Sequence, residues 1–425
     1  MSAALPAGFR KLTTAERREA IRARHPDITD AALGADPDML ELADVMVESA
    51  VGYFALPIGI ATGFRVDGAD YDVPLATEEP SVVAAASYGA SVVRRGGGFT
   101  TEPGELVTTG QLFVEHAGTA AAERVREAEG RLRAQAHRLV ERMEHRGGGW
   151  RGMDVAWLPA TGLLRVQIHV DARDAMGANV VNSIAEALRP PVEELTGGRV
   201  VMAILSNASD RRVTAARFSV KTGTLARAGV AGPEAARRIV LANEIAREDP
   251  TRAVTHNKGI MNGITALALA TGNDTRALEA AVHSYAARDG SYRALTSYRV
   301  ADDRLHGSVE LPLPLGTVGG ATGVHPTSAA ALAMLGAPDA STLARVAAGV
   351  GLAQNFAALF ALVTEGIQQG HMGLHAERIA WMAGARDDER RLVVQAMRDR
   401  GRYGVDIASE ELARVRSAQP GNGSS

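Results

Sequence analysis

The chain has 425 residues, of which 46% are apolar and 22% charged, and its formal net charge is −3. These values are typical of a soluble globular protein with room for more than one domain, and they give no electrostatic reason to expect nucleic acid or an anionic membrane as a partner. Cysteine is absent, which excludes disulfides, thiolate metal sites and a cysteine nucleophile.

The first residues lack the apolar core of a signal peptide, and we find no run of about 18 apolar residues that would indicate a transmembrane helix. We therefore expect a cytoplasmic protein that does not enter a membrane.

The pattern over residues 35–57 predicts a helix that ends near Gly52, and residues 58–77 read as loop and strand. A helix with small side chains follows over residues 81–95, with Ser81 as its N-cap. The glycine-rich stretch 96–105 marks a domain boundary.

Residues 107–220 alternate strands and helices in a recognisable order. Strands are predicted over 107–116, 154–160, 162–171 and 199–205, and a further one over 216–220; helices are predicted over 120–145 and 175–195. The resulting β-α-β-β-α-β order is that of the ferredoxin-like fold.

The rest of the chain is predicted to be mainly helical. We expect helices over 233–249, 257–272, 274–290 and 341–367, and a strand with a glycine-rich loop over 305–320. With the preceding unit, this gives an α+β chain.

Two charged residues could carry chemistry. Glu79 stands beside Pro80 at a helix entrance, where a buried carboxyl with a raised pKa can donate a proton; equally, an exposed acid there complements the helix dipole. Lys258, with Gly259 beside it, is one of only three lysines, and a compact ammonium can stabilise an oxyanion; the alternative is a surface lysine in a turn.

Three further segments allow both a functional and a structural interpretation. Asp274 either caps a helix or fixes Lys258, and His371 either acts as a general acid after a glycine hinge or is an ordinary surface or core histidine. Residues 170–179 form a strand-to-helix turn that can bind phosphate through free backbone N–H groups. The segment lacks the GxGxxG fingerprint, and the chain has neither a Walker A nor an HExxH motif.

Together, these segments resemble the class II 3-hydroxy-3-methylglutaryl-coenzyme A (HMG-CoA) reductases. The resemblance runs in order over nearly the whole chain and rests on TEEPSVVAAAS, DAMGANVVN, THNKGIMNG, TGND, VGGATGVHP, GLAQN and QGHM. It implies an NAD(P)-dependent oxidoreductase of isoprenoid metabolism that interconverts HMG-CoA with mevalonate and coenzyme A by two hydride transfers, through mevaldyl-CoA and mevaldehyde.

The resemblance also implies residue roles. Lys258 would stabilise the oxyanion, His371 would protonate the leaving thiolate, and Glu79 would supply the proton for mevaldehyde reduction. Asp274 would lie between Glu79 and Lys258 and couple their protonation states. The implied substrate-binding residues are Ser81, Arg252, Asn262 and Asn355, with Arg10 at the coenzyme A phosphates; the implied cofactor-binding residues are Asp174, Met176, Gly177, Ala178, Asn179 and Asn207, with Arg142 as a candidate for accepting NADP(H).

The implied organisation is a large, mainly helical substrate domain (1–106 and 221–367), an inserted ferredoxin-like cofactor domain (107–220) and a mobile C-terminal helical flap (368–425). The resemblance implies a homodimer or higher homo-oligomer, a cofactor that is NAD(H) or NADP(H), and no metal. Ser49 stands where the family commonly has asparagine. The sequence leaves open a catabolic role in mevalonate oxidation and a catalytically silent coenzyme A- or nucleotide-binding homologue.

Overall fold

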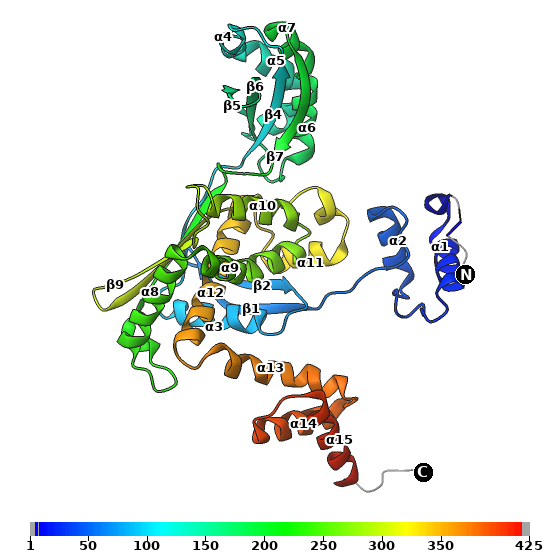
Figure 1. The fold of residues 1–425 in the computed structure, drawn as a ribbon, viewed down its shortest axis with the longest axis vertical. Helices are drawn as coiled ribbons and strands as arrows, with labels where there is room; N and C mark the ends of the chain where they lie inside the picture. The colour runs from blue at the N-terminus through cyan, green and yellow to red at the C-terminus, as the bar shows by residue number, and fades with distance from the viewer. Residues whose placement is uncertain (1–4, 7, 419–425) are drawn as a thin grey trace.

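The computed structural model describes residues 5–6 and 8–418, with the backbone alone at 367–374 and 418. Figure 1 shows a central unit, a smaller unit at one end that holds β4 to β7, and helices α13 to α15 at the other end. The N-terminal helices α1 and α2 project to one side. The mixture of helices and sheets agrees with the predicted α+β class.

The central unit contains two antiparallel sheets. One is the hairpin of β1 (Ile58–Val66) and β2 (Ala69–Ala76); the other has the order β3-β8-β10-β9. The hairpin turns at Asp67 and Gly68, whose φ angles of 48° and 85° match a two-residue turn that needs positive φ at both positions. The strands of the second sheet are β3 (Thr100–Glu102), β8 (Val213–Lys221), β9 (Thr296–Ala301) and β10 (Arg304–Pro312).

The strand β8 lies in a different place from the one expected. The sequence pattern grouped it with the smaller unit, but β8 pairs with β10 over nine residue pairs and with β3 on its other side. The β10 residues that pair with β8 lie 83 to 99 positions further along the chain, so the local pattern could not reveal this pairing.

Helix α12 (Ala340–Val363) runs through the middle of the central unit and packs against α3 (Val82–Arg94) and α9 (Pro250–Ala270). Glycine permits this close contact, because a Cβ at Gly89 of α3 would lie 2.3 Å from the carbonyl oxygen of Ala353. The remaining helical elements are α8 (Gly232–Glu248), α10 (Thr275–Ala286), α11 (Pro326–Met334), η2 (Thr222–Leu225) and η3 (Gly320–Gly323).

By length and composition alone, α12 could cross a membrane. However, 78% of its most apolar window is buried inside the protein. Its side chains belong to the same hydrophobic core as the central strands. Its composition therefore suits the centre of a folded domain.

The smaller unit has the predicted strand and helix order. Its sheet runs β5-β6-β4-β7, which is the ferredoxin-like arrangement, and it has a hydrophobic core of its own. Each predicted helix is split into two. The elements are β4 (Val107–Glu115), α4 (Ala121–Glu127), α5 (Glu129–Glu144), β5 (Gly149–Leu158), β6 (Leu163–Asp171), α6 (Ala178–Ala187), α7 (Arg189–Thr196) and β7 (Arg199–Ser206).

The chain ends are helical. At the N-terminus lie η1 (Phe9–Lys11), α1 (Thr14–Arg24) and α2 (Pro37–Met46); at the C-terminus lie α13 (Ile367–Met382), α14 (Asp387–Arg400) and α15 (Val405–Ala418). Helix α2 ends six residues before the predicted Gly52. Arg17 and Arg18 of α1 donate to the carbonyl oxygens of Ala50 and Val51, and Ser49 has a φ of 61°. These contacts hold the segment after α2 out of a helix.

Candidate active site

Lys258 and Glu79 meet although they are far apart in the sequence. Lys258 lies on α9, which begins at Pro250 after the N-cap Asp249, and Glu79 lies in the loop between β2 and α3. The Lys258 Nζ donates to Glu79 Oε2 over 3.1 Å, and the two side chains are 59% and 42% exposed. An ion pair this exposed contributes little to stability. Its value lies in holding an ammonium beside a carboxyl at an open pocket.

Two details differ from the sequence expectations. Glu79 is half-exposed and paired rather than buried. Gly259, expected at a close backbone approach, lies inside α9, and a Cβ added there would meet nothing within 4 Å.

The pocket around this pair has a volume of about 280 Å³. Asn262, a predicted substrate-binding residue, lines it one helical turn after Lys258. Its polar lining residues are Thr77, Glu78, Glu79, Lys258, Asn262, Thr265, Glu279 and His283, above apolar side chains that include Val82, Met261 and Leu269.

Sequence reasoning missed Glu279 and His283, which lie one turn apart on α10 and face this pocket. His283 Nε2 lies 2.9 Å from Glu279 Oε2, its Nδ1 lies 2.7 Å from the Tyr292 hydroxyl, and Thr265 donates to Glu279 Oε1 over 2.6 Å. Burial acts to raise the pKa of Glu279, but the hydrogen bonds of His283 and Thr265 outweigh it and lower the pKa. The i, i+4 spacing of Glu and His was the available signal.

Asp274 has the contacts of a helix cap. Its Oδ1 accepts from the backbone N–H of Arg276 and Ala277 at 3.0 and 3.2 Å, and its carboxylate pairs with the Arg276 side chain at 3.1 Å. Within the described residues, these contacts do not include Lys258 or Glu79. Asp274 lines a different cavity, so its coupling to Lys258 stays a prediction.

That second cavity has a volume of about 670 Å³ and holds most of the predicted cofactor residues. Helix α6 begins at Ala178, and its N-cap Gly177 has a φ of 96° and no side-chain capping bond. A Cβ at Gly177 would lie 2.7 Å from that of Ala172, so glycine is required there. The free N–H groups of this helix start suit an anionic ligand. The lining comprises Met46, Val47, Met143, residues 175–180, residues 272–274, Arg276, Gly316 and residues 318–322.

A third cavity of about 510 Å³ adjoins both. It shares Ala76 and Leu269 with the Lys258 pocket, and Gly272, Asn273 and Ala321 with the cavity at α6. The Lys258 pocket and the two cavities therefore form a continuous series from Lys258 to the start of α6. A nicotinamide dinucleotide anchored at α6 fits a site that leads toward Lys258, since the donors at α6 suit its phosphates.

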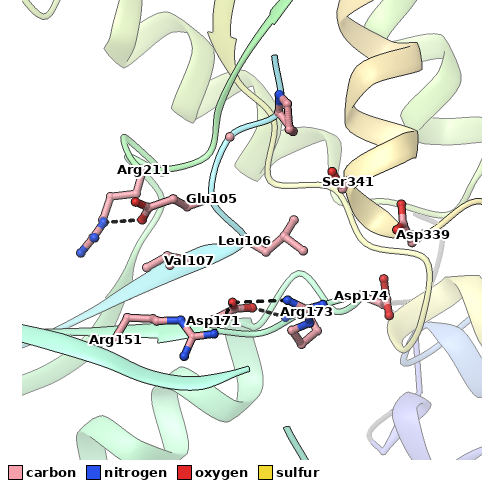
Figure 2. A pocket seen from close by; sticks show the side chains of 12 residues that line it. Glu105, Leu106, Val107, Arg151, Asp171, Arg173, Asp174, Arg211, Asp339 and Ser341 are labelled. Atoms are coloured by element: carbon pink, nitrogen blue, oxygen red, sulfur yellow. Dashed lines mark hydrogen bonds and ion pairs between the residues drawn. The ribbon is translucent and has the colours of Figure 1, made fainter. Parts of the chain in front are cut away.

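Four other predicted residues line none of these three cavities. Asn355 is buried. Its side-chain oxygen accepts a hydrogen bond from the Tyr298 hydroxyl, and its side-chain nitrogen lies 3.1 Å from His256 Nε2. Ser81 is the N-cap of α3 with a φ of 77°, but it makes no side-chain capping bond. Asp174 Oδ1 accepts from the backbone N–H of Ala340 at the start of α12, toward which it points in Figure 2. Arg252 lies on α9 near His256.

Arg10, Arg142 and Asn207 are exposed and line none of the three cavities. The side chain of His371 lies outside the described residues. Over the described part of the chain, no group of three or more His, Asp or Glu residues could hold a metal ion.

Comparison with known proteins gives a consistent result. The sequence model of the family described as hydroxymethylglutaryl-coenzyme A reductase matches residues 13–376. A 3-hydroxy-3-methylglutaryl-coenzyme A reductase from Archaeoglobus fulgidus is 44% identical over 98% of this chain and 96% of its own length. The probable enzyme of that name from Borreliella burgdorferi is 35% identical over 87% of this chain and 86% of its own.

Solved structures of the Streptococcus pneumoniae enzyme are also similar. One has a TM-score of 0.76 at 39% identity and covers 96% of this chain and 99% of that chain. Another, described as class II and bound to NADPH in open conformations, has a TM-score of 0.75 at 39% identity and covers 95% of this chain and 100% of that chain.

Proposed function

The chain belongs to the hydroxymethylglutaryl-coenzyme A reductase family, and from this premise we propose how its own residues carry out the reaction. The enzyme is an oxidoreductase that interconverts HMG-CoA and mevalonate by two hydride transfers. In the reductive direction, two reduced nicotinamides and two protons convert HMG-CoA into mevalonate and free coenzyme A. Each reduced dinucleotide would supply one hydride when bound, so two of them are used in turn.

The contact between Lys258 and Glu79 is the observation that carries the proposed site. When hydride reaches the thioester carbon, negative charge develops on its oxygen, and we assign stabilisation of that charge to the compact Lys258 ammonium. Collapse of the hemithioacetal breaks the C–S bond and releases mevaldehyde with a thiolate. We assign protonation of that thiolate to His371, on the strength of the resemblance of QGHM.

Glu79 takes part in the second reduction. Hydride addition to mevaldehyde leaves an alkoxide that needs one proton, and the 3.1 Å contact links the Glu79 carboxyl to Lys258. We propose that Glu79 supplies this proton, and that Asp274 tunes the pair from the adjoining dinucleotide cavity. Asn262 and Ser81, together with Arg252 and Asn355, are proposed to orient the HMG carboxylate and hydroxyl, with Arg10 at the coenzyme A phosphates.

For the cofactor we propose NADPH, bound at residues 174–179 with Asn207. The Streptococcus pneumoniae relative binds NADPH. At the end of α5, Glu144 Oε2 lies 2.6 Å from His137 Nδ1, so this carboxylate is already engaged, while Arg142 is exposed. The exposed Arg142 favours a 2′-phosphate and the exposed Glu141 beside it would repel one, so the choice of NADPH rests mainly on the relative.

We propose that the enzyme works as a homodimer or a larger homo-oligomer in the cytoplasm. Phe54, on the middle cavity, is 87% exposed, and Val45, Met46 and Val47 nearby are also exposed. A second copy covering these side chains would close the site from water. The division into a substrate domain, an inserted cofactor domain and a C-terminal flap forms part of the same proposal.

The test mixes purified protein with HMG-CoA and either NADPH or NADH, and follows the loss of nicotinamide absorbance. We expect turnover, and faster turnover with NADPH at low cofactor concentration. Mevalonate, coenzyme A and each oxidised cofactor are run in parallel, since the same residues serve the catabolic direction. An absence of turnover in every combination would contradict the proposed activity.

A further inference from the structure

Arg212 is a buried cation at the junction of the two units. Arg212 lies between β7 and β8, where the chain returns to the central unit, and it is 2% exposed. Its Nη1 donates to the carbonyl oxygen of Met176 over 3.0 Å, and its Nη2 donates to that of Leu315 over 3.1 Å. Met176 belongs to the small unit and Leu315 follows β10 in the central unit, so one guanidinium bridges the two.

The segment that Arg212 holds is the cofactor loop, which we define as residues 174–177. Thr108 also donates to the Met176 carbonyl oxygen, over 2.7 Å. The N–H groups of Thr317 and Val318 donate to the carbonyl oxygen of Asp174 at 2.8 and 3.3 Å. The cofactor loop therefore lies directly along residues 315–318 of the central unit.

The contact leaves no room for adjustment at its centre. A Cβ added to Gly316 would lie 2.7 Å from the backbone nitrogen of Met176. The N–H of Gly316 is fixed in turn by Asn273 Oδ1 over 2.7 Å, next to Asp274. Arg212 thus clamps a junction that connects the start of α6 to the TGND segment.

The burial of this arginine is hard to explain by stability alone. Burial lowers the pKa of Arg212 to about 10, with only the charge of Asp171 opposing it, and its Nε has no hydrogen-bond partner among the described residues. Asp171 itself pairs with Arg151 and Arg173, as Figure 2 shows. A buried cation held by carbonyl oxygens often contributes no more to stability than an apolar side chain of similar size.

We propose that Arg212 is a positioning residue for the dinucleotide: it fixes the cofactor loop against residues 315–318, so that the start of α6 and the catalytic pocket keep one relative placement. The inference rests on the proposed function, because it takes residues 174–179 as the cofactor site. Hydride transfer needs the nicotinamide, bound by the small unit, at a set distance from a substrate held by the central unit. Loss of the clamp lets that distance vary.

The chain provides a matched control in the neighbouring residue. Arg211 is exposed at 36% of its side chain and pairs with Glu105 at 2.9 Å, on the side of the junction that Figure 2 shows. Its removal deletes the same charge one position earlier but leaves the carbonyl oxygens of Met176 and Leu315 with their donors.

The experiment compares the wild-type enzyme with Arg212→Met, Arg212→Lys and Arg211→Met. NADPH binding is measured directly by fluorescence titration, and kcat and both KM values by turnover. We expect Arg212→Met to weaken NADPH binding about tenfold or more, equivalent to about 1.4 kcal/mol, and to lower kcat, with the KM for HMG-CoA nearly unchanged. Lysine, which can reach one carbonyl oxygen, should restore part of the loss, and Arg211→Met should match the wild type.

A folded Arg212→Met that is less stable but binds NADPH as the wild type does, with unchanged kcat, would overturn the proposal, because a merely structural role predicts that pattern. If Arg212→Met does not fold, Thr108→Val removes the other donor to Met176 and decides the matter by the same titration: weaker binding supports the clamp and unchanged binding refutes it. If the wild type binds NADPH but does not turn over HMG-CoA, the proposed function is contradicted. The NADPH titrations of the variants then still decide whether Arg212 positions the cofactor loop.

Discussion

Lys258 gains its significance from its neighbours. Lys258 is one of three lysines in the sequence, and it precedes a glycine. The structure places it in a pocket with Glu79, Asn262, Glu279 and His283. The pair with Glu79 is too exposed to matter much for folding. A residue that contributes little to stability but lies at the centre of a polar pocket is expected to affect rate and not fold.

Lys258→Ala should therefore lower kcat by about 100-fold or more, since it removes the proposed oxyanion donor, while changing the free energy of unfolding by less than about 1 kcal/mol. Lys258→Arg should not restore the rate, because the planar guanidinium cannot replace a compact ammonium. Steady-state kinetics and urea unfolding check both statements, with the exposed Lys221→Ala as the control. A near-normal rate for Lys258→Ala would rule out the oxyanion role.

At the scale of elements, His256 ties the lysine-bearing helix to its surroundings. The imidazole Nε2 of this α9 residue lies 2.5 Å from the Thr296 hydroxyl of β9 and 3.1 Å from the Asn355 amide of α12. Burial, and to a lesser degree the charge of Arg252, lowers the pKa of His256 to about 3 from an ordinary 6.5. The folded protein thus keeps this histidine neutral.

This lowered pKa predicts acid sensitivity. Between the folded value of about 3 and the ordinary value of 6.5, the unfolded chain holds a proton on His256 that the folded chain lacks. Stability from this group is therefore complete above 6.5 and falls by up to about 1.4 kcal/mol per pH unit as the pH decreases through that window. Urea unfolding of the wild type and His256→Gln should show a shallower pH dependence in the variant; parallel curves would contradict the assignment.

The elements also show what the sequence could predict. The order of strands and helices from β4 to β7 followed from local periodicity and was confirmed, as was the α3 helix. The end of α2 and the sheet of β8 were misplaced, because arginines on α1 and a strand far along the chain determine them. The motifs that resemble the family predicted Glu79, Lys258 and Asn262, which share one pocket, whereas Glu279 and His283 joined them only because folding placed α10 beside α9.

On the scale of the whole molecule, the residues proposed to carry the reaction lie in three separate parts of the structure. Figure 1 shows the small unit and helices α13 to α15 extending from opposite ends of the central unit. The cofactor loop belongs to one end and His371 to the other, while Lys258 lies between them. Arg212 already holds the cofactor loop against the central unit, so a complete reaction depends on how the C-terminal end that carries His371 is brought to Lys258.

His371→Gln should separate the two reductions. Only the reaction of HMG-CoA releases a thiolate that needs a proton, so this variant should slow turnover of HMG-CoA more than turnover of free mevaldehyde. His375→Gln, one helical turn further on α13, serves as the comparison. Equal losses for HMG-CoA and mevaldehyde in His371→Gln would contradict the proposed role.

The most direct test of the central claim is the ratio of NADPH oxidised to coenzyme A thiol released during HMG-CoA turnover. Two successive hydride transfers in one site predict a ratio of two, with mevalonate as the product. A ratio of one with mevaldehyde accumulating, or thiol release without NADPH oxidation, would contradict the account.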